Sequence, residues 1–115
     1  MKVIVNQAHV SNYPNPIRFN KGDPLMLGAL DTEYPGWIRT RTEDGNEGWA
    51  PVQYIDRDEL NQSQGTANTD YSAFELNTRQ GDTLTVLSEL NDWYRACNED
   101  GTEGWVPVNT VVPFS

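Results

Sequence analysis

A ten-residue motif that occurs twice, 56 residues apart, is the strongest constraint on what this chain can fold into. Residues 43–52 (EDGNEGWAPV) return at residues 99–108 (EDGTEGWVPV). The agreement extends upstream as matched pairs: Trp37 and Trp93, Arg39 and Arg95, Gly22 and Gly81, Ala8 and Ala67. Two copies of roughly 50 residues each indicate duplication of a whole domain, because solenoids need at least three shorter repeats.

Each copy predicts short strands and no helix. Asp44-Gly45 and Asp100-Gly101 lie between strand-like runs, where a hairpin needs a residue with positive φ. Turn signals recur at the spacing of a small all-β domain, and closing the sheet into a barrel would remove exposed edges. The runs are 3–5, 24–27, 37–41 and 49–51 in the first copy, and 84–87, 93–97 and 105–107 in the second.

These patterns predict two domains in tandem. Residues 1–57 form the first, residues 58–66 a polar linker that can also provide the first strand of the second domain, and residues 67–115 the second. Residues 2–7 are expected to supply the first strand of the first domain. Four Trp, five Tyr and three Phe provide apolar mass for two cores, although domains of about 55 residues lie near the lower size limit for independent folding.

The net charge of −9 is unevenly placed along the sequence. Residues 1–57 carry six Lys and Arg against seven Asp and Glu, whereas residues 58–115 carry two against ten. An acidic field repels phosphate groups, so nucleic acid and anionic membrane surfaces are not expected as partners. The charge favours basic partners or simply keeps an acidic protein in solution.

The single cysteine, Cys97, cannot form a disulfide within the chain, and the absence of a disulfide framework is typical of a reducing compartment. The opening apolar run is too short for a signal-peptide core, and no apolar stretch could span a membrane. A cytoplasmic location is therefore predicted.

The sequence offers few residues that could support catalysis. His9 is the only histidine, and no nearby serine, cysteine or acid completes a catalytic triad with it in the sequence, so a structural or surface role is expected. Cys97 has no adjacent base that would lower its pKa. The acidic turns at 43–45 and 98–101 do not follow a calcium-binding loop. We expect no enzyme activity, no metal and no cofactor.

The combined pattern resembles the SH3 family. The first copy gives IRFNKGD at 17–23, Trp37-Ile38 and GNEGWAPVQYI at 45–55. The second gives Asp70-Tyr71, LNTRQGD at 76–82, Trp93-Tyr94 and GTEGWVPVNTV at 101–111. This resemblance implies two small SH3-like five-stranded β-barrels in tandem, and a shortened loop before each Gly-Asp is more similar to bacterial or variant members.

The resemblance also implies a non-enzymatic protein- or peptide-binding module, which takes proline-rich or basic extended peptides on aromatic shelves. The shelf residues would be Trp37, Trp49, Pro51 and Tyr54 in the first copy, and Tyr71, Trp93, Trp105 and Pro107 in the second. Acids that would select a basic ligand are Asp70, Glu75, Glu89 and Asp92. Neither shelf is complete, since the resemblance places tyrosines where the first copy has Val10 and Asn12 and the second copy has Thr69 and Thr110.

Two alternatives remain open from the sequence. The aromatic faces could form an interdomain or homo-oligomer interface in a structural or assembly protein, with the apolar residues 111–114 contributing. The chain could also be a cell-wall-binding SH3 protein. The duplicated Arg39 and Arg95 are expected to pair with neighbouring carboxylates on the sheet surface.

Overall fold

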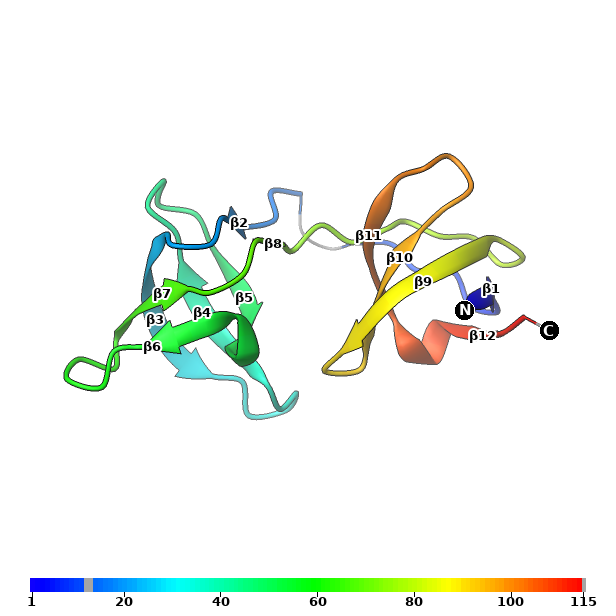
Figure 1. The fold of residues 1–115 in the computed structure, drawn as a ribbon. Helices are drawn as coiled ribbons and strands as arrows, with labels where there is room; N and C mark the ends of the chain where they lie inside the picture. Colours follow the sequence, from blue (N-terminus) through cyan, green and yellow to red (C-terminus); the bar gives the residue numbers. More distant parts are fainter. Residues whose placement is uncertain (12–13, 115) are drawn as a thin grey trace. The chain divides into compact units, whose positions relative to one another are not determined.

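The computed structural model describes residues 1–11 and 14–114, and within them the chain consists of short strands and two single 3₁₀ turns (Figure 1). The described residues contain no α-helix, which confirms the predicted all-β class. Consistently, no helix in this part of the chain is long and apolar enough to cross a membrane.

The chain forms two compact units, and they do not follow the order of the repeats. Residues 15–73 form one unit, here called the central unit, while Met1–Pro14 and Phe74–Ser115 together form the other, the terminal unit. The domain boundaries predicted around residues 58–66 therefore do not coincide with the compact units. The chain passes from one unit to the other twice, near Pro14 and near Phe74.

The central unit contains a five-stranded antiparallel sheet in the order β5-β4-β3-β7-β6, and a separate two-stranded pair of β2 and β8. A register shift between Leu27 and Leu30 bends β3. The elements are β2 (Arg18–Phe19), β3 (Pro24–Leu30), β4 (Trp37–Arg41), β5 (Glu47–Pro51), the 3₁₀ turn η1 (Val52–Tyr54), β6 (Ile55–Arg57), β7 (Gln64–Ala67) and β8 (Tyr71–Ser72).

The terminal unit repeats this architecture with the order β11-β10-β9-β1-β12. A register shift between Arg95 and Ala96 accompanies the pairing of β9 with β10. The elements are β1 (Lys2–Val5), β9 (Thr83–Leu90), β10 (Trp93–Cys97), β11 (Glu103–Pro107), the 3₁₀ turn η2 (Val108–Thr110) and β12 (Val111–Pro113). Two five-stranded antiparallel sheets agree with the predicted fold class, although strand pairing among the described residues leaves each sheet with two edge strands and does not close it into a barrel.

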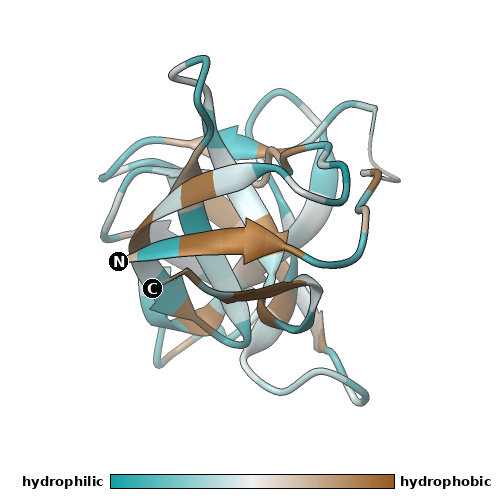
Figure 2. Ribbon diagram, turned by 90° about the vertical axis from the view of Figure 1, so that its right-hand side faces the viewer, coloured by the Kyte–Doolittle hydropathy of each residue, from teal (hydrophilic) through white to brown (hydrophobic). Residues whose placement is uncertain are grey.

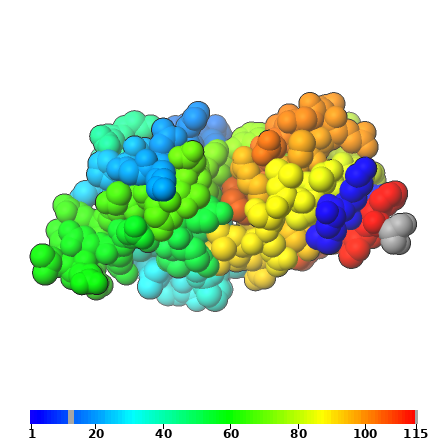
Figure 3. Space-filling view, viewed as in Figure 1, coloured from blue at the N-terminus to red at the C-terminus, as the bar shows by residue number. Residues whose placement is uncertain are grey.

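The two repeats exchange their first strands. In the terminal unit β1 lies between β9 and β12, the place that β7 takes between β3 and β6 in the central unit. The first strand of the first repeat thus belongs to the sheet of the second repeat, and the reverse holds for β7. Figure 3 shows the N-terminal residues in blue beside the red C-terminal strand and the yellow β9.

Side-chain packing follows the exchange. Val3 and Val5 of β1 are 1% and 2% exposed and belong to a core otherwise made of second-repeat residues, among them Leu84 and Val106. Figure 2 shows β1 as a hydrophobic strand beginning at the N label. In the central unit, a Cβ on Gly65 of β7 would lie 2.9 Å from Ile55 Cγ2 and 3.0 Å from Leu27 Cδ1. Both interfaces are close-packed.

The turns agree with the predicted hairpins. Gly45 and Gly101 have φ of 85° and 87°, which is the left-handed region these loops require. Between β9 and β10, Asn91 and Asp92 both have positive φ, as a two-residue hairpin loop demands. The corresponding connection in the central unit is the longer segment 31–36.

Candidate functional site

The exchange redistributes the predicted shelf residues. Tyr71, assigned from sequence to the second shelf, lies in the central unit, because the boundary between the units falls at residues 73 and 74. Trp37, Trp49, Pro51 and Tyr54 also lie in the central unit, and Trp93, Trp105 and Pro107 in the terminal unit. The first predicted shelf therefore gains a tyrosine that the second loses.

Three rings of the central unit, Phe19, Tyr54 and Tyr71, form what we call the Tyr71 cluster. The Tyr71 ring lies 5.3 Å from Phe19 and 5.8 Å from Tyr54, centroid to centroid, and the Tyr54 contact is edge-on at 67°. Strand pairing places Phe19 opposite Tyr71, and the Tyr71 hydroxyl donates to the Trp49 carbonyl at 3.3 Å. Tyr71 and Phe19 are buried, and Tyr54 is half-buried. The cluster thus offers mainly Tyr54 to a ligand.

A tryptophan stands opposite a proline in each unit, with different exposure. Trp37 of β4 pairs with Pro51 of β5, and Trp93 of β10 pairs with Pro107 of β11. Trp37 and Pro51 are buried, whereas Trp93 and Pro107 are half-buried. We call Trp93 and Pro107 the Trp93 surface. Of the two equivalent pairs, this one is open to solvent.

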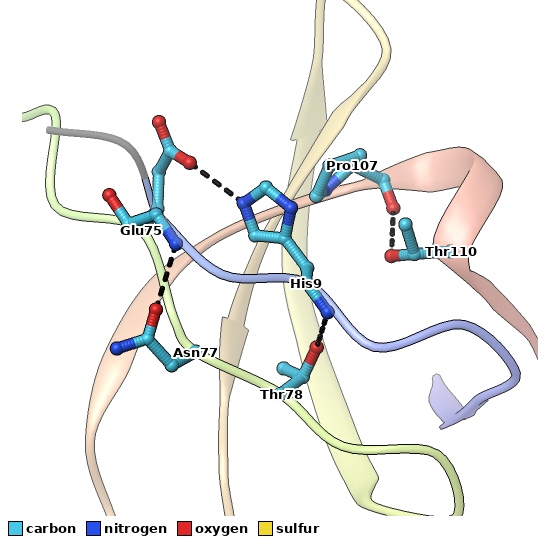
Figure 4. A network of polar contacts seen from close by, with 7 residues as sticks. His9, Glu75, Asn77, Thr78, Pro107 and Thr110 are labelled. Atoms are coloured by element: carbon cyan, nitrogen blue, oxygen red, sulfur yellow. Dashed lines mark hydrogen bonds and ion pairs between the residues drawn. The ribbon is translucent and has the colours of Figure 1, made fainter.

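His9 lies beside the Trp93 surface although it comes from the first repeat. Its imidazole meets the Trp93 ring edge-on at 78°, with the centroids 5.8 Å apart. Nε2 of His9 lies 2.7 Å from Oε1 of Glu75, and Figure 4 shows this contact. The two side chains are only 18% and 11% exposed, so the pair is largely sheltered from water.

Backbone pairing fixes both members of this pair. The amide of His9 donates to the carbonyl and the hydroxyl of Thr78, and the Thr78 amide donates back to the His9 carbonyl at 2.8 Å. Glu75 forms an isolated parallel bridge with Trp105, next to the bond from the Leu76 amide to the Trp105 carbonyl. Both side chains therefore project from defined backbone positions.

The end of each 3₁₀ turn differs between the units. Tyr54 ends η1, but η2 ends at Thr110, whose hydroxyl donates to the Pro107 carbonyl at 2.8 Å (Figure 4). Thr110 is buried. The terminal unit therefore lacks an aromatic ring at this position and has His9 next to its tryptophan instead.

The other two predicted tryptophans, Trp49 and Trp105, each have an arginine over the ring. Arg39 lies 5.7 Å from the Trp49 ring centroid, and Arg95 lies 5.9 Å from that of Trp105. Each arginine also pairs with a carboxylate, Glu47 at 3.5 Å and Glu103 at 3.8 Å, which confirms the predicted role of the duplicated arginines. Trp105 is 4% exposed and presents no open face, whereas Trp49 is half-buried like Trp93 but has Arg39 over its ring.

The predicted specificity acids are divided between the units. Asp70 lies in the central unit and accepts a hydrogen bond from the Lys21 amide at 2.7 Å. Glu75, Glu89 and Asp92 lie in the terminal unit, and Glu89 and Asp92 are exposed. Counting Asp, Glu, Lys and Arg by unit gives five basic against ten acidic residues in the central unit and three against seven in the terminal unit. The charge asymmetry along the sequence disappears in the folded protein.

The described residues offer no obvious metal chemistry. Among residues 1–11 and 14–114, no group of three or more His, Cys, Asp and Glu side chains could hold a metal ion. In the same part of the chain every buried side-chain nitrogen or oxygen has a hydrogen-bond partner. Beside the Trp93 surface, the side chains of His9 and Glu75 are bound to each other.

His9 is the residue that the sequence analysis did not assign to a site. Its partner Glu75 is 66 positions away, and nothing within either repeat indicates that strands are exchanged.

Comparison with known families agrees with the two-domain architecture. A family model described as "Variant SH3 domain" matches residues 2–56, and one described as "SH3 domain" matches residues 69–108. No curated protein and no solved structure matches the chain significantly. Each match follows one repeat along the sequence, whereas the compact units combine segments of both.

Proposed function

Because this chain is a tandem SH3-domain protein, and SH3 domains are in general non-catalytic protein-interaction modules, we propose that it binds an extended, proline-containing segment of a partner protein on the Trp93 surface. The observation that carries this proposal is the half-buried pair of Trp93 and Pro107, which stand opposite each other on β10 and β11. A cytoplasmic location remains part of the proposal.

The physical basis is the shape and stiffness of the ligand. A segment in the polyproline II conformation is already extended, so it loses little conformational entropy on docking, and flat rings pack against its ridges. Trp93 supplies a large ring with a polar N–H, and Pro107 supplies a rigid apolar neighbour. Such aromatic anchors often account for most of the binding energy of an interface.

The Tyr71 cluster is proposed as a weaker second contact. Tyr54 is half-buried there, and the Asn68 side-chain amide beside it already donates to the Gln53 carbonyl and to the Asp56 carboxylate. Burial of Tyr71 leaves less aromatic area for a ligand than Trp93 offers. A ligand that reached both units would gain affinity through effective concentration.

An NMR titration with a synthetic proline-rich peptide tests the proposal. The four tryptophan indole signals report on Trp37 and Trp49 in the central unit and on Trp93 and Trp105 in the terminal unit. We expect the Trp93 indole to shift first and to saturate. Trp93→Ala should weaken binding about 30-fold, the effect of losing an anchor worth about 2 kcal/mol.

Tyr34→Ala provides the matched control, because Tyr34 is an aromatic residue of the central unit that is 64% exposed. Its removal should leave the peptide affinity within about twofold of the wild type. Peptide binding that survives Trp93→Ala unchanged, in a variant that keeps its dispersed amide spectrum, would show that the ligand uses another surface.

A further inference from the structure

The carboxylate next to the Trp93 surface is already occupied by a side chain of the protein itself. Glu75 Oε1 lies 2.7 Å from His9 Nε2, and the Glu75 side chain is 11% exposed (Figure 4). A sheltered carboxylate requires a hydrogen-bond donor or a positive charge, since leaving it without a partner is costly. His9, a residue of the same chain, is that partner.

This pairing changes what the surface can recognise. An exposed acid beside an aromatic ring would attract an Arg or Lys of a bound peptide. Here a basic ligand side chain that took Oε1 of Glu75 would have to displace the imidazole, which is also held edge-on against Trp93, and the 11% exposure of the Glu75 side chain leaves little of its other oxygen for a ligand. The displaced imidazole would lose both contacts, and that loss would cancel much of the gain from the new ion pair.

We propose that His9 determines the ligand specificity of the Trp93 surface by holding Glu75 away from ligands, so that the surface selects proline-containing segments without requiring a basic residue. This inference rests on the proposed function. It assigns Glu75 to the protein's own histidine, so that of the three predicted specificity acids in the terminal unit the exposed Asp92 and Glu89 are left to attract basic peptides from a distance. The exchange of first strands is essential to it, because His9 follows β1 into the terminal unit.

Two peptides that differ only by Arg or Gln at one flanking position test the inference. The readout is the ratio of their dissociation constants, measured from the Trp93 indole shift. In the otherwise unchanged protein, Glu75→Gln should leave this ratio within about twofold, because Glu75 does not face the ligand. His9→Ala should raise the preference for the Arg peptide about tenfold, the value of one newly available charged hydrogen bond.

Combining His9→Ala with Glu75→Gln should remove the gained preference, which identifies Glu75 as its source. Asp92→Asn is the matched control: it removes an exposed charge and should lower the Arg preference equally with and without His9. If His9→Ala does not fold, the single Glu75→Gln variant still tests the inference. A loss of Arg preference greater than threefold in Glu75→Gln overturns it.

Failure of the proposed function would give a different titration result from failure of the specificity role of His9. If neither peptide shifts the Trp93 indole in any variant, the Trp93 surface is not a peptide site and the specificity role of His9 falls with it. If both peptides bind but His9→Ala leaves their ratio unchanged, the peptide site stands and only the role of His9 is refuted.

Discussion

Replacing Val5 by alanine is expected to destabilise the terminal unit, although Val5 belongs to the first repeat. Val5 is 2% exposed and packs with Leu84, Ala96 and Val106. The substitution removes two buried methyl groups, which costs about 1.6 kcal/mol in transfer free energy at about 0.8 kcal/mol per group. The cavity raises the total to about 2 to 3 kcal/mol, or roughly 10 to 20 °C in Tm for a unit of this size.

Thermal unfolding followed by indole and amide NMR separates the two units. The signals of Trp93 and Trp105 should disappear at lower temperature in Val5→Ala, while those of Trp37 and Trp49 keep their wild-type midpoint. Val10→Ala makes the same deletion in the same repeat at a side chain that is 68% exposed. It should change stability by less than about 0.5 kcal/mol.

The opposite order of melting would refute the strand exchange. If Val5→Ala lowers the midpoint of the Trp37 and Trp49 signals instead, β1 pairs within its own repeat. The terminal-unit hydrogen bonds from the Val5 amide to the Asp82 carbonyl and from the Gly81 amide to the Val5 carbonyl, both 2.8 Å, would then not exist in solution.

Two further substitutions test the packing and a turn. Gly65→Ala in β7 should destabilise the central unit by about 1 to 3 kcal/mol in urea unfolding, because its Cβ would meet Ile55 Cγ2 at 2.9 Å; Gly28→Ala, whose closest contact would be 3.4 Å, should be nearly neutral. The Thr42 hydroxyl donates to Asp44 and lowers the pKa of that carboxyl, so carboxyl NMR should show that pKa rising in Thr42→Val. Since the folded pKa is the lower one, this contact stabilises the turn above the unfolded pKa, and its contribution is lost as the pH falls through the folded pKa.

The repeat determined most of what could be predicted about the fold. The matched turns at Asp44-Gly45 and Asp100-Gly101 and the matched tryptophans specify local hairpins, which depend on neighbours in sequence. Strand exchange is a choice between two long-range pairings of similar local energy. Val3-Ile4-Val5 can cover either sheet, because both have an open place of the same kind between corresponding strands. No pattern within one repeat distinguishes these pairings.

The same ambiguity explains where the site prediction differed from the structure. Trp93, Pro107 and Tyr54 could be located from the family pattern, because each lies on a hairpin or turn defined within its own repeat. Tyr71 and His9 lie in the two segments that follow the exchanged strands, so their neighbours depend on which sheet those strands join. The acidic and the nearly neutral half of the sequence do not correspond to the two units for the same reason, because each unit contains segments of both halves.

Strand exchange makes both proposed ligand surfaces products of the whole chain. The first repeat alone would leave β3 and β6 without the β7 strand between them, and the second repeat alone would leave β9 and β12 without β1. Each surface also takes one ring from the other repeat: Tyr71 meets Tyr54 in the central unit, and His9 meets Trp93 in the terminal unit. The two repeats form similar sheets, and the exchange of first strands places different residues next to equivalent positions of these sheets. Two related repeats can in this way place different residues around the same central tryptophan and proline pair.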